Sequence, residues 1–183
     1  YGFSKYSSEH LIREFSFLYK IKYIINRLGV ISGPWQFGRE DQGFVSLWVW
    51  KHINKKKLKY IGFGGFGLQV RDVVHITDVC RLITKQIKKI NHVNNLTLNA
   101  GGGINNAISL KNLTKICQKV TSNRIKIFSK KTTSEYDIPY YVTNNSKVKK
   151  IYNWYPKKSF LNVVEDIYKW MFLNKKILKK YIK

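Results

Sequence analysis

Tyr1 and Lys5 are the first residues of the chain whose types and spacing could do chemistry. Residues four apart on a helix project from one face about one turn apart, so the Lys5 ammonium can lie beside the Tyr1 phenol. A nearby cation favours the phenolate form of a group whose pKa is otherwise about 10. Such a phenol could take the proton of a hydroxyl group while hydride leaves the same carbon. The spacing alone is common among helices and does not assign a function.

Two glycine clusters could cradle a phosphate, but neither has the surroundings that this requires. Residues 62–67, GFGGFG, match the dinucleotide pattern G-x-G-x-x-G letter for letter. In that motif the glycines end a strand and open a helix, and an acidic residue follows about 20 positions later. Here residues 69–76 continue as extended chain. We therefore predict a tight turn at 62–67 and a strand-to-helix turn at 101–103.

The elements that must position these residues alternate between helix and strand. Apolar spacing and capping residues predict helices over 1–18, 44–52, 77–89, 110–120 and 145–154, and a long amphipathic helix after Ser159. Period-two and β-branched stretches predict strands over 20–27, 58–63, 69–76, 96–100, 124–130 and 137–143. Residues 28–43, with five glycines and prolines, are predicted to form a long loop. The alternation indicates an α/β fold, and no repeat or linker divides the chain.

Composition limits the kinds of partner and site. Of 34 basic residues, 28 are lysine, and the net charge is +24. Lysine dispersed among asparagine, isoleucine and tyrosine favours a solvated surface over a nucleic-acid site. A basic nucleic-acid-binding module is kept only as an alternative function of a different kind. Cys80 and Cys117 lack CxxC spacing, which favours two buried thiols and no metal site. The absence of a disulfide-like cysteine pattern leads us to expect a reducing, cytoplasmic setting. Apolar stretches are shorter than the roughly 20 residues that span a bilayer, so we expect no membrane segment.

Five motifs in order carry a family resemblance. They are YGFSK at 1–5, RLGVISGPWQFGREDQG at 27–43, GFGLQVRDVVHITD at 65–78, LNAGGG at 98–103 with SLKNL at 109–113, and NWYPKKSF at 153–160. Together they resemble the carboxyl-terminal half of an extended short-chain dehydrogenase/reductase, a family that modifies nucleotide sugars. Residues 33–43 and 67–75 are most similar to the members that invert carbon 2 of a CDP-3,6-dideoxyhexose. The resemblance covers nearly the whole chain.

The resemblance implies a fold and a reaction. We expect residues 1–35 to end a Rossmann-like core, and residues 36–183 to form mostly the substrate-binding region with returning core elements. The family's NAD-binding strands, and the Ser or Thr partner of its tyrosine, precede the tyrosine and are not in these 183 residues. The chain is therefore expected to be inactive as given. NAD as cofactor, a nucleotide-sugar substrate and a possible homo-oligomer are implied, with a 4-epimerase or dehydratase as the alternative activity.

The same resemblance assigns roles on the cofactor side. Tyr1 matches the acid/base, and Lys5 matches the residue that orients the nicotinamide ribose and lowers the pKa of the phenol. The backbone predicted to line nicotinamide belongs to Leu28, Gly29, Val30 and Ile31. A buried strand end without cofactor contact is equally open for these four residues.

On the substrate side, Arg71 matches the arginine that holds the substrate diphosphate. A guanidinium forks onto phosphate oxygens better than an ammonium does. The alternative for Arg71 is a surface ion pair with its neighbour Asp72. Gln42 could donate or accept a hydrogen bond with the sugar or phosphate, or simply belong to a helix-capping loop. His75 is interpreted as structural.

Overall fold

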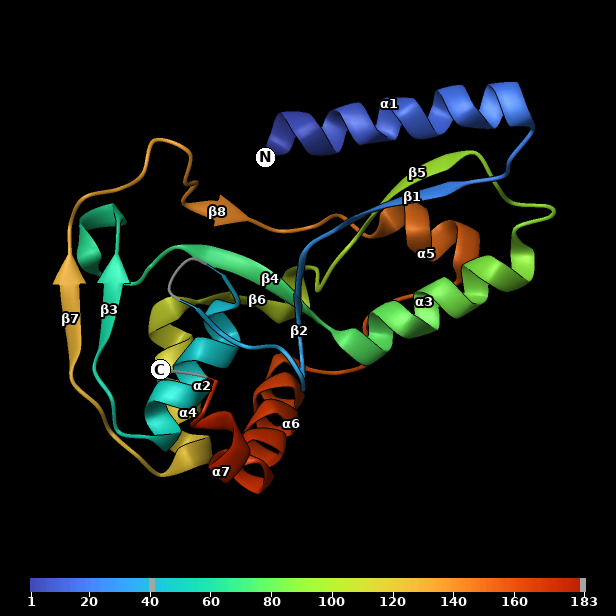
Figure 1. Ribbon diagram of the computed structural model, residues 1–183. Coiled ribbons are helices and arrows are strands. Elements are labelled where there is room, and N and C mark those ends of the chain that lie inside the picture. Colours follow the sequence, from blue (N-terminus) through green and yellow to red (C-terminus); the bar gives the residue numbers. More distant parts are fainter. Residues whose placement is uncertain (40–41, 182–183) are drawn as a thin grey trace.

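The predicted alternation of helices and strands is present in the computed structural model, which describes residues 1–39 and 42–181 (Figure 1). Glu40 and Asp41, within the 33–43 motif, lie outside the described residues. The helices are α1 (Gly2–Tyr19), α2 (Phe44–Ile53), α3 (Ile76–Lys89), α4 (Leu110–Thr121), α5 (Ser146–Tyr152), α6 (Phe160–Leu173) and α7 (Lys175–Leu178). The strands are β1 (Ile24–Leu28), β2 (Val30–Ser32), β3 (Leu58–Ile61), β4 (Val70–His75), β5 (Leu96–Ala100), β6 (Ala107–Ser109), β7 (Ile127–Lys130) and β8 (Tyr140–Tyr141).

The strands form three groups. β1 and β5 pair in parallel over their full lengths, with Ile24 opposite Leu96 and Leu28 opposite Ala100. β4 is central to the largest group, in which β2 and β8 pair with it in parallel and β6 pairs with it antiparallel. β3 and β7 form a separate parallel pair. β4 is thus the strand to which distant parts of the chain attach.

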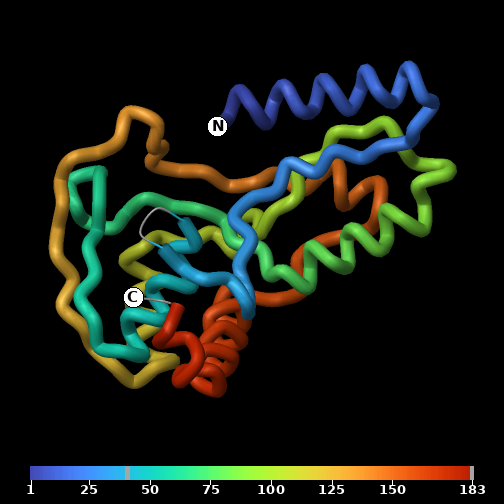
Figure 2. The backbone as a smooth tube through the Cα atoms, viewed as in Figure 1, coloured from blue at the N-terminus to red at the C-terminus, as the bar shows by residue number. Residues whose placement is uncertain are grey.

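Two hydrophobic clusters hold these groups together. One lies around β1 and β5 and is covered by α3 and α5; it includes Leu82, Leu98 and the fully buried Trp154. The larger one is formed mainly where α2, α4 and α6 meet. Figure 2 follows the chain from α1 through β1 and β2 toward α2, so these first strands connect the two parts. The boundary at residue 35 stays a prediction.

Local sequence signals explain several boundaries. Ser159 caps α6 in a reciprocal capping box with Asn162, and the Ser109 side chain caps α4, as predicted. Residues 62–67 form the predicted tight turn between β3 and β4, with a short 3₁₀ turn (Phe63–Gly65) inside it. Gly62, Gly64, Gly65 and Gly67 all have positive φ there, a conformation that glycine adopts without steric cost. Residues 62–67 therefore form a turn, although they match the dinucleotide-binding pattern.

Other predictions need correction. The loop expected over 28–43 contains β2, because residues 30–32 pair with β4, a long-range contact that the glycine-rich sequence did not suggest. The 101–103 turn leads into a 3₁₀ turn (Ile104–Asn106) and β6 rather than directly into a helix. Cys80 was predicted to be buried and is exposed, whereas Cys117 is buried and its thiol pKa is raised by burial. In the described part of the chain, no helix is both long and apolar enough to cross a membrane.

Candidate active site

Tyr1 and Lys5 lie together at the amino-terminal end of α1. Tyr1 is the N-cap residue, and its carbonyl oxygen accepts a hydrogen bond from the Lys5 amide nitrogen at 3.1 Å. The Lys5 ammonium nitrogen lies over the phenol ring, 5.5 Å from the ring centroid. The predicted spacing on one helix face is therefore confirmed. The phenol itself is 95% exposed, so a ligand can reach it from solvent.

Two polar contacts set the direction of α1 against the β1–β5 pair. Glu9 accepts two hydrogen bonds from Arg27 of β1, at 2.7 and 2.8 Å, and Arg13 donates one to Thr97 of β5 at 3.1 Å. Thr97 lies opposite Ile25 of β1, so Arg13 is level with Ile25 while Glu9 is level with Arg27. The first residues of α1 therefore lie toward the carboxyl end of β1. At 1.5 Å per residue, Tyr1 lies about 12 Å beyond Glu9 along the helix axis. Tyr1 and Lys5 therefore lie on the side of the carboxyl end of β1 (Figure 1).

Residues 28–31 lie at that same end of the sheet. Leu28 ends β1, Val30 begins β2, and the Gly29 amide between them donates to the Ala100 carbonyl at 2.9 Å. Ligands of open parallel sheets bind outside the carboxyl ends of the strands. The structure thus brings the backbone of residues 28–31 and the Tyr1–Lys5 helix end to the edge where such ligands bind. Contact of residues 28–31 with a cofactor stays a prediction.

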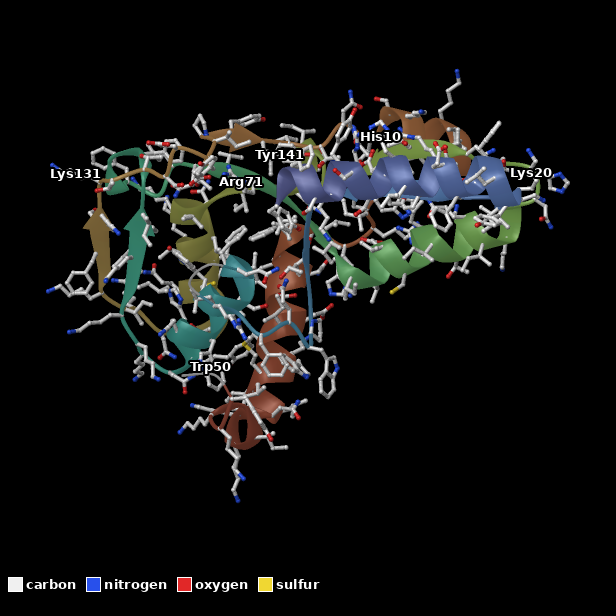
Figure 3. All side chains as sticks on the ribbon, turned by 45° about the horizontal axis from the view of Figure 1, so that its top comes forward. His10, Lys20, Trp50, Arg71, Lys131 and Tyr141 are labelled. Atoms are coloured by element: carbon white, nitrogen blue, oxygen red, sulfur yellow. The ribbon has the colours of Figure 1, made fainter. Side chains whose placement is uncertain are left out.

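Arg71 lies on β4 and does not pair with its neighbour Asp72. Its Nη2 donates to Asp137 at 2.5 Å, and its Nη1 donates to the Val70 carbonyl at 2.8 Å. The alternative of an Arg71–Asp72 pair is wrong because successive strand residues point to opposite faces. Tyr141 of β8 lies opposite Arg71, as Figure 3 shows. Asp137 was not identified from the sequence, since the ion pair joins residues 66 positions apart.

Asp72 points into the protein and is fully buried. Its Oδ2 accepts a hydrogen bond from the Gly103 amide at 2.9 Å, while no donor among the described residues reaches its Oδ1. A Cβ atom added to Gly101 would lie 2.5 Å from Asp72 Oδ2 and 2.3 Å from Thr143 Oγ1. Asp72 therefore holds the 101–103 turn against β4. Asp72 and Thr143 leave no room for a side chain at Gly101, and the Val73 backbone leaves none at Gly102.

Gln42 precedes α2, and one side of α2 lines a cavity that the sequence did not reveal. The Gln42 side chain is exposed and has no hydrogen bond among the described residues, while its carbonyl accepts from the Arg39 amide at 2.7 Å. The cavity, of about 380 Å³, lies between α2, β3 and β7. Its lining residues are Phe44, Leu47, Trp48, Lys51, Lys57, Leu58, Lys59, Ile61, Leu110 and Phe128. The i, i+3, i+4, i+7 spacing of the first four was the available signal.

His75 has the structural role that was predicted. It is the N-cap of α3, and its Nδ1 accepts from the Thr77 amide at 3.2 Å. Burial lowers its pKa, while the charge of Asp166, 3.6 Å from Nε2, acts in the opposite direction. Over residues 1–39 and 42–181, no three His, Cys, Asp or Glu side chains gather as metal ligands would.

Comparison with known proteins gives the context for this geometry. A family model described as the NAD dependent epimerase/dehydratase family matches residues 1–101. The chain is 27% identical over 172 residues to CDP-paratose 2-epimerase of Salmonella typhi, covering 93% of this chain and 51% of that protein. It is 26% identical to UDP-glucuronate 4-epimerase of Thermodesulfobacterium geofontis, covering 98% and 52%. The chain thus spans about half the length of the curated relatives it matches.

Solved structures share the fold. UDP-glucose 4-epimerase of Thermotoga maritima, determined with UDP-glucose, superimposes with a TM-score of 0.81 at 23% identity, over 97% of this chain and 54% of that one. UDP-glucose 4-epimerase of Thermus thermophilus, in complex with NAD, gives 0.80 at 18% identity, over 94% and 53%. The α/β, Rossmann-like fold expected from the sequence is therefore confirmed, and each of these structures extends well beyond the part that this chain matches.

Proposed function

This chain belongs to the NAD dependent epimerase/dehydratase family, and from that premise we propose that it serves a nucleotide-sugar epimerase acting at carbon 2 of a CDP-3,6-dideoxyhexose. The reaction would convert CDP-paratose to CDP-tyvelose. Its support is the likeness to CDP-paratose 2-epimerase over 93% of the chain, together with the motifs at 33–43 and 67–75. A 4-epimerase or a dehydratase is the alternative, supported by the likeness to UDP-glucuronate 4-epimerase.

The observation that carries the proposal is the place of the Tyr1–Lys5 pair. The Lys5 ammonium lies 5.5 Å from the centroid of the phenol ring, at the helix end beside the carboxyl end of β1. A phenol with an adjacent ammonium is suited to exchange a proton with a sugar hydroxyl. The backbone of residues 28–31 lies on the same side of the sheet, where a flat cofactor ring could rest. The residues present therefore fit NAD.

Each residue then has a defined task. Lys5 and the backbone of residues 28–31 would hold NAD, which would supply a hydride acceptor and donor for carbon 2. Tyr1 takes the hydroxyl proton as carbon 2 is oxidised to a ketone and gives it back when the ketone is reduced. Lys5, whose ammonium lies 5.5 Å from the centre of the phenol ring, would hydrogen-bond the ribose of the cofactor. Because the carbon 2 hydrogen is not acidic, oxidation and reduction offer the easier route to inversion.

Arg71 and the cavity between α2, β3 and β7 would hold the nucleotide. The Arg71 guanidinium, about one-fifth exposed, can donate paired hydrogen bonds to a diphosphate. The cavity has apolar and aromatic walls, including Phe44, Trp48 and Phe128, and Lys51, Lys57 and Lys59 also line it. Ligand pockets of this size are ordinarily apolar with a few polar groups that orient the ligand. We therefore assign the diphosphate to Arg71 and the nucleoside to this cavity.

Calorimetric titration of CDP into the 183-residue chain tests the nucleotide site. We expect saturable binding, weakened at least about tenfold by Arg71→Ala, because a charge-assisted hydrogen bond is lost. Arg124→Ala is the matched control, since Arg124 is exposed and forms no ion pair with the described residues. Equal weakening in both variants would argue for nonspecific attraction to a basic surface.

Product analysis tests the reaction. Joining the chain to the amino-terminal half of the Salmonella typhi relative supplies the NAD-binding elements, and nuclear magnetic resonance then follows CDP-paratose. We expect inversion at carbon 2 by this fusion, no turnover by the 183 residues alone, and no turnover by the Tyr1→Phe fusion. Inversion at carbon 4, or loss of water, would replace the proposed reaction with the alternative.

A further inference from the structure

The guanidinium of Arg71 is already engaged by a carboxylate. Nη2 donates to Asp137 Oδ1 at 2.5 Å, and Nη1 donates to the Val70 carbonyl oxygen at 2.8 Å. The two side chains remain 20% and 37% exposed, so the pair is open to solvent and to ligands. An anion that binds Arg71 must therefore either displace Asp137 or approach its negative charge closely.

Asp137 is held beside Arg71 by the backbone around it. Residues 131–139 are attached at one end by the hydrogen bond from the Phe63 amide to Thr133 Oγ1, 2.8 Å, and at the other by that from the Val70 amide to the Pro139 carbonyl, 2.9 Å. Between these attachments the Asp137 amide donates to the Ser134 carbonyl at 3.0 Å, and the Ile138 amide donates to Asp137 Oδ1 at 3.0 Å. These hydrogen bonds hold the segment that carries Asp137 beside Arg71 in the absence of a ligand.

The charge of Asp137 is unusual for its surroundings. Between Asn123 and Asn162 the sequence contains only two acidic residues, Glu135 and Asp137, among many lysines. Glu135 is exposed and forms no ion pair with the described residues, whereas Asp137 contacts the one arginine on β4. An exposed ion pair contributes little to stability, so its placement is better explained by an effect on what Arg71 binds.

We propose that Asp137 sets the affinity of the site by competing with an anionic ligand for Arg71. The inference rests on Arg71 binding the diphosphate, as proposed above. In the free protein Asp137 neutralises the guanidinium, and the diphosphate takes its place when it binds. The competition lowers affinity, and release of product after turnover is eased by the same carboxylate returning to Arg71.

Titration of CDP and of inorganic pyrophosphate into the 183-residue chain tests the competition. Asp137→Asn is expected to bind both about two- to fivefold more tightly, the range that corresponds to the strength of an exposed ion pair. Glu135→Gln is the matched control, because it removes a negative charge from the same segment without touching Arg71, and its affinities should equal those of the wild type. In the Arg71→Ala background, Asp137→Asn should bring no gain.

The outcomes separate this inference from the proposed function. Weaker binding by Asp137→Asn would show that Asp137 positions Arg71 for the ligand, and would overturn the competition while leaving the nucleotide site intact. Equal gains in Asp137→Asn and Glu135→Gln would overturn it in favour of general electrostatics. Failure of all folded variants to bind either probe would overturn both proposals. Asp137→Ser is the second variant, judged by the same criteria, should thermal unfolding show that Asp137→Asn does not fold.

Discussion

The two regions that carry the candidate chemistry are built in opposite ways. On α1, Tyr1 and Lys5 face solvent, and none of the helix's residues, all of which the structure describes, is buried. On β4, Arg71 has a carboxylate partner and Asp72 is fully buried against the 101–103 turn. The α1 pair depends on helix geometry alone. The positions of Arg71 and Asp72 depend on the contacts of β4 with β2, β6, β8 and the 101–103 turn.

This difference matches the roles proposed for the two regions, which are proton transfer at Tyr1 and ligand positioning at Arg71. A reactive phenol needs access, and the Tyr1–Lys5 pair has it because Tyr1 is 95% exposed and no residue of α1 is buried. A guanidinium that binds a diphosphate needs a fixed direction, and β4 supplies it through β2, β6, β8 and the buried Asp72 carboxylate. We therefore expect substitutions near β4 to affect folding strongly, and equivalent substitutions on α1 to affect it weakly.

The same glycine-to-alanine change in both regions should give the largest contrast. A Cβ at Gly102 would lie 2.2 Å from the Val73 carbonyl oxygen, a backbone atom of β4 that cannot move aside. We expect Gly102→Ala to lower the free energy of unfolding by about 3 kcal/mol, the upper range for overpacking. At Gly2 of α1 nothing lies within 4 Å, and Gly2→Ala should raise it by about 0.5 kcal/mol. Urea unfolding measures both, and similar effects at the two sites would refute the contrast.

Asp72 should account for the next largest effect. Asp72→Ala leaves the buried Gly103 amide without its acceptor, which should cost about 2–3 kcal/mol. Asp72→Asn keeps an oxygen for that amide and removes the buried charge, so we expect a much smaller loss. Urea unfolding of the two variants distinguishes the roles of hydrogen bond and charge. If both variants lose the same stability, the carboxylate acts through its charge and not as an acceptor.

The sequence predicted the α1 region more completely than the β4 region. The spacing of Tyr1 and Lys5 within five residues predicted their contact, because helix periodicity is a local property. Ser109 and Ser159 were likewise identified as helix caps from nearby residues. The fold class followed from the alternation of elements, and the order of motifs from Tyr1 to Trp154 indicated the family.

The sequence could not predict contacts between residues that are far apart in the chain. Arg71 was identified, but its partner Asp137 comes from β8's approach to β4, and Asp72 meets Gly103 only because the 101–103 turn folds over β4. β2 was missed because three residues in a glycine-rich stretch carry too little periodicity. The cavity depends on α2 packing against β3 and β7, so its apolar residues looked like ordinary core positions.

Acidification should lower the stability of the protein through His75, the last residue of β4. Burial is the main cause of its lowered pKa, and the Lys158 charge adds to it while Asp166 opposes it. Between that lowered pKa and the ordinary 6.5, the unfolded chain binds more protons than the folded one, so stability should fall as pH drops through this window. His75→Asn keeps a good N-cap side chain and should reduce the pH dependence, and the remainder is expected from His52, whose pKa is also lowered by burial. His10→Asn on α1 is the control, and an unchanged slope for His75→Asn would contradict this assignment.

The smallest effect is expected on α1, from the Glu9–Arg27 contact. The hydrogen bond from Arg27 is the main cause that lowers the pKa of Glu9, so its contribution to stability is present above the ordinary value of 4.5 and is lost as pH falls through the lowered value. Glu9→Gln should therefore lower the thermal unfolding temperature slightly at pH 7 and low salt, and match the wild type in strong acid or high salt, where the charge is removed or screened. A large loss at pH 7 that salt does not diminish would show that α1 is held as firmly as β4. The contrast between an accessible α1 and a firmly held β4 would then fail.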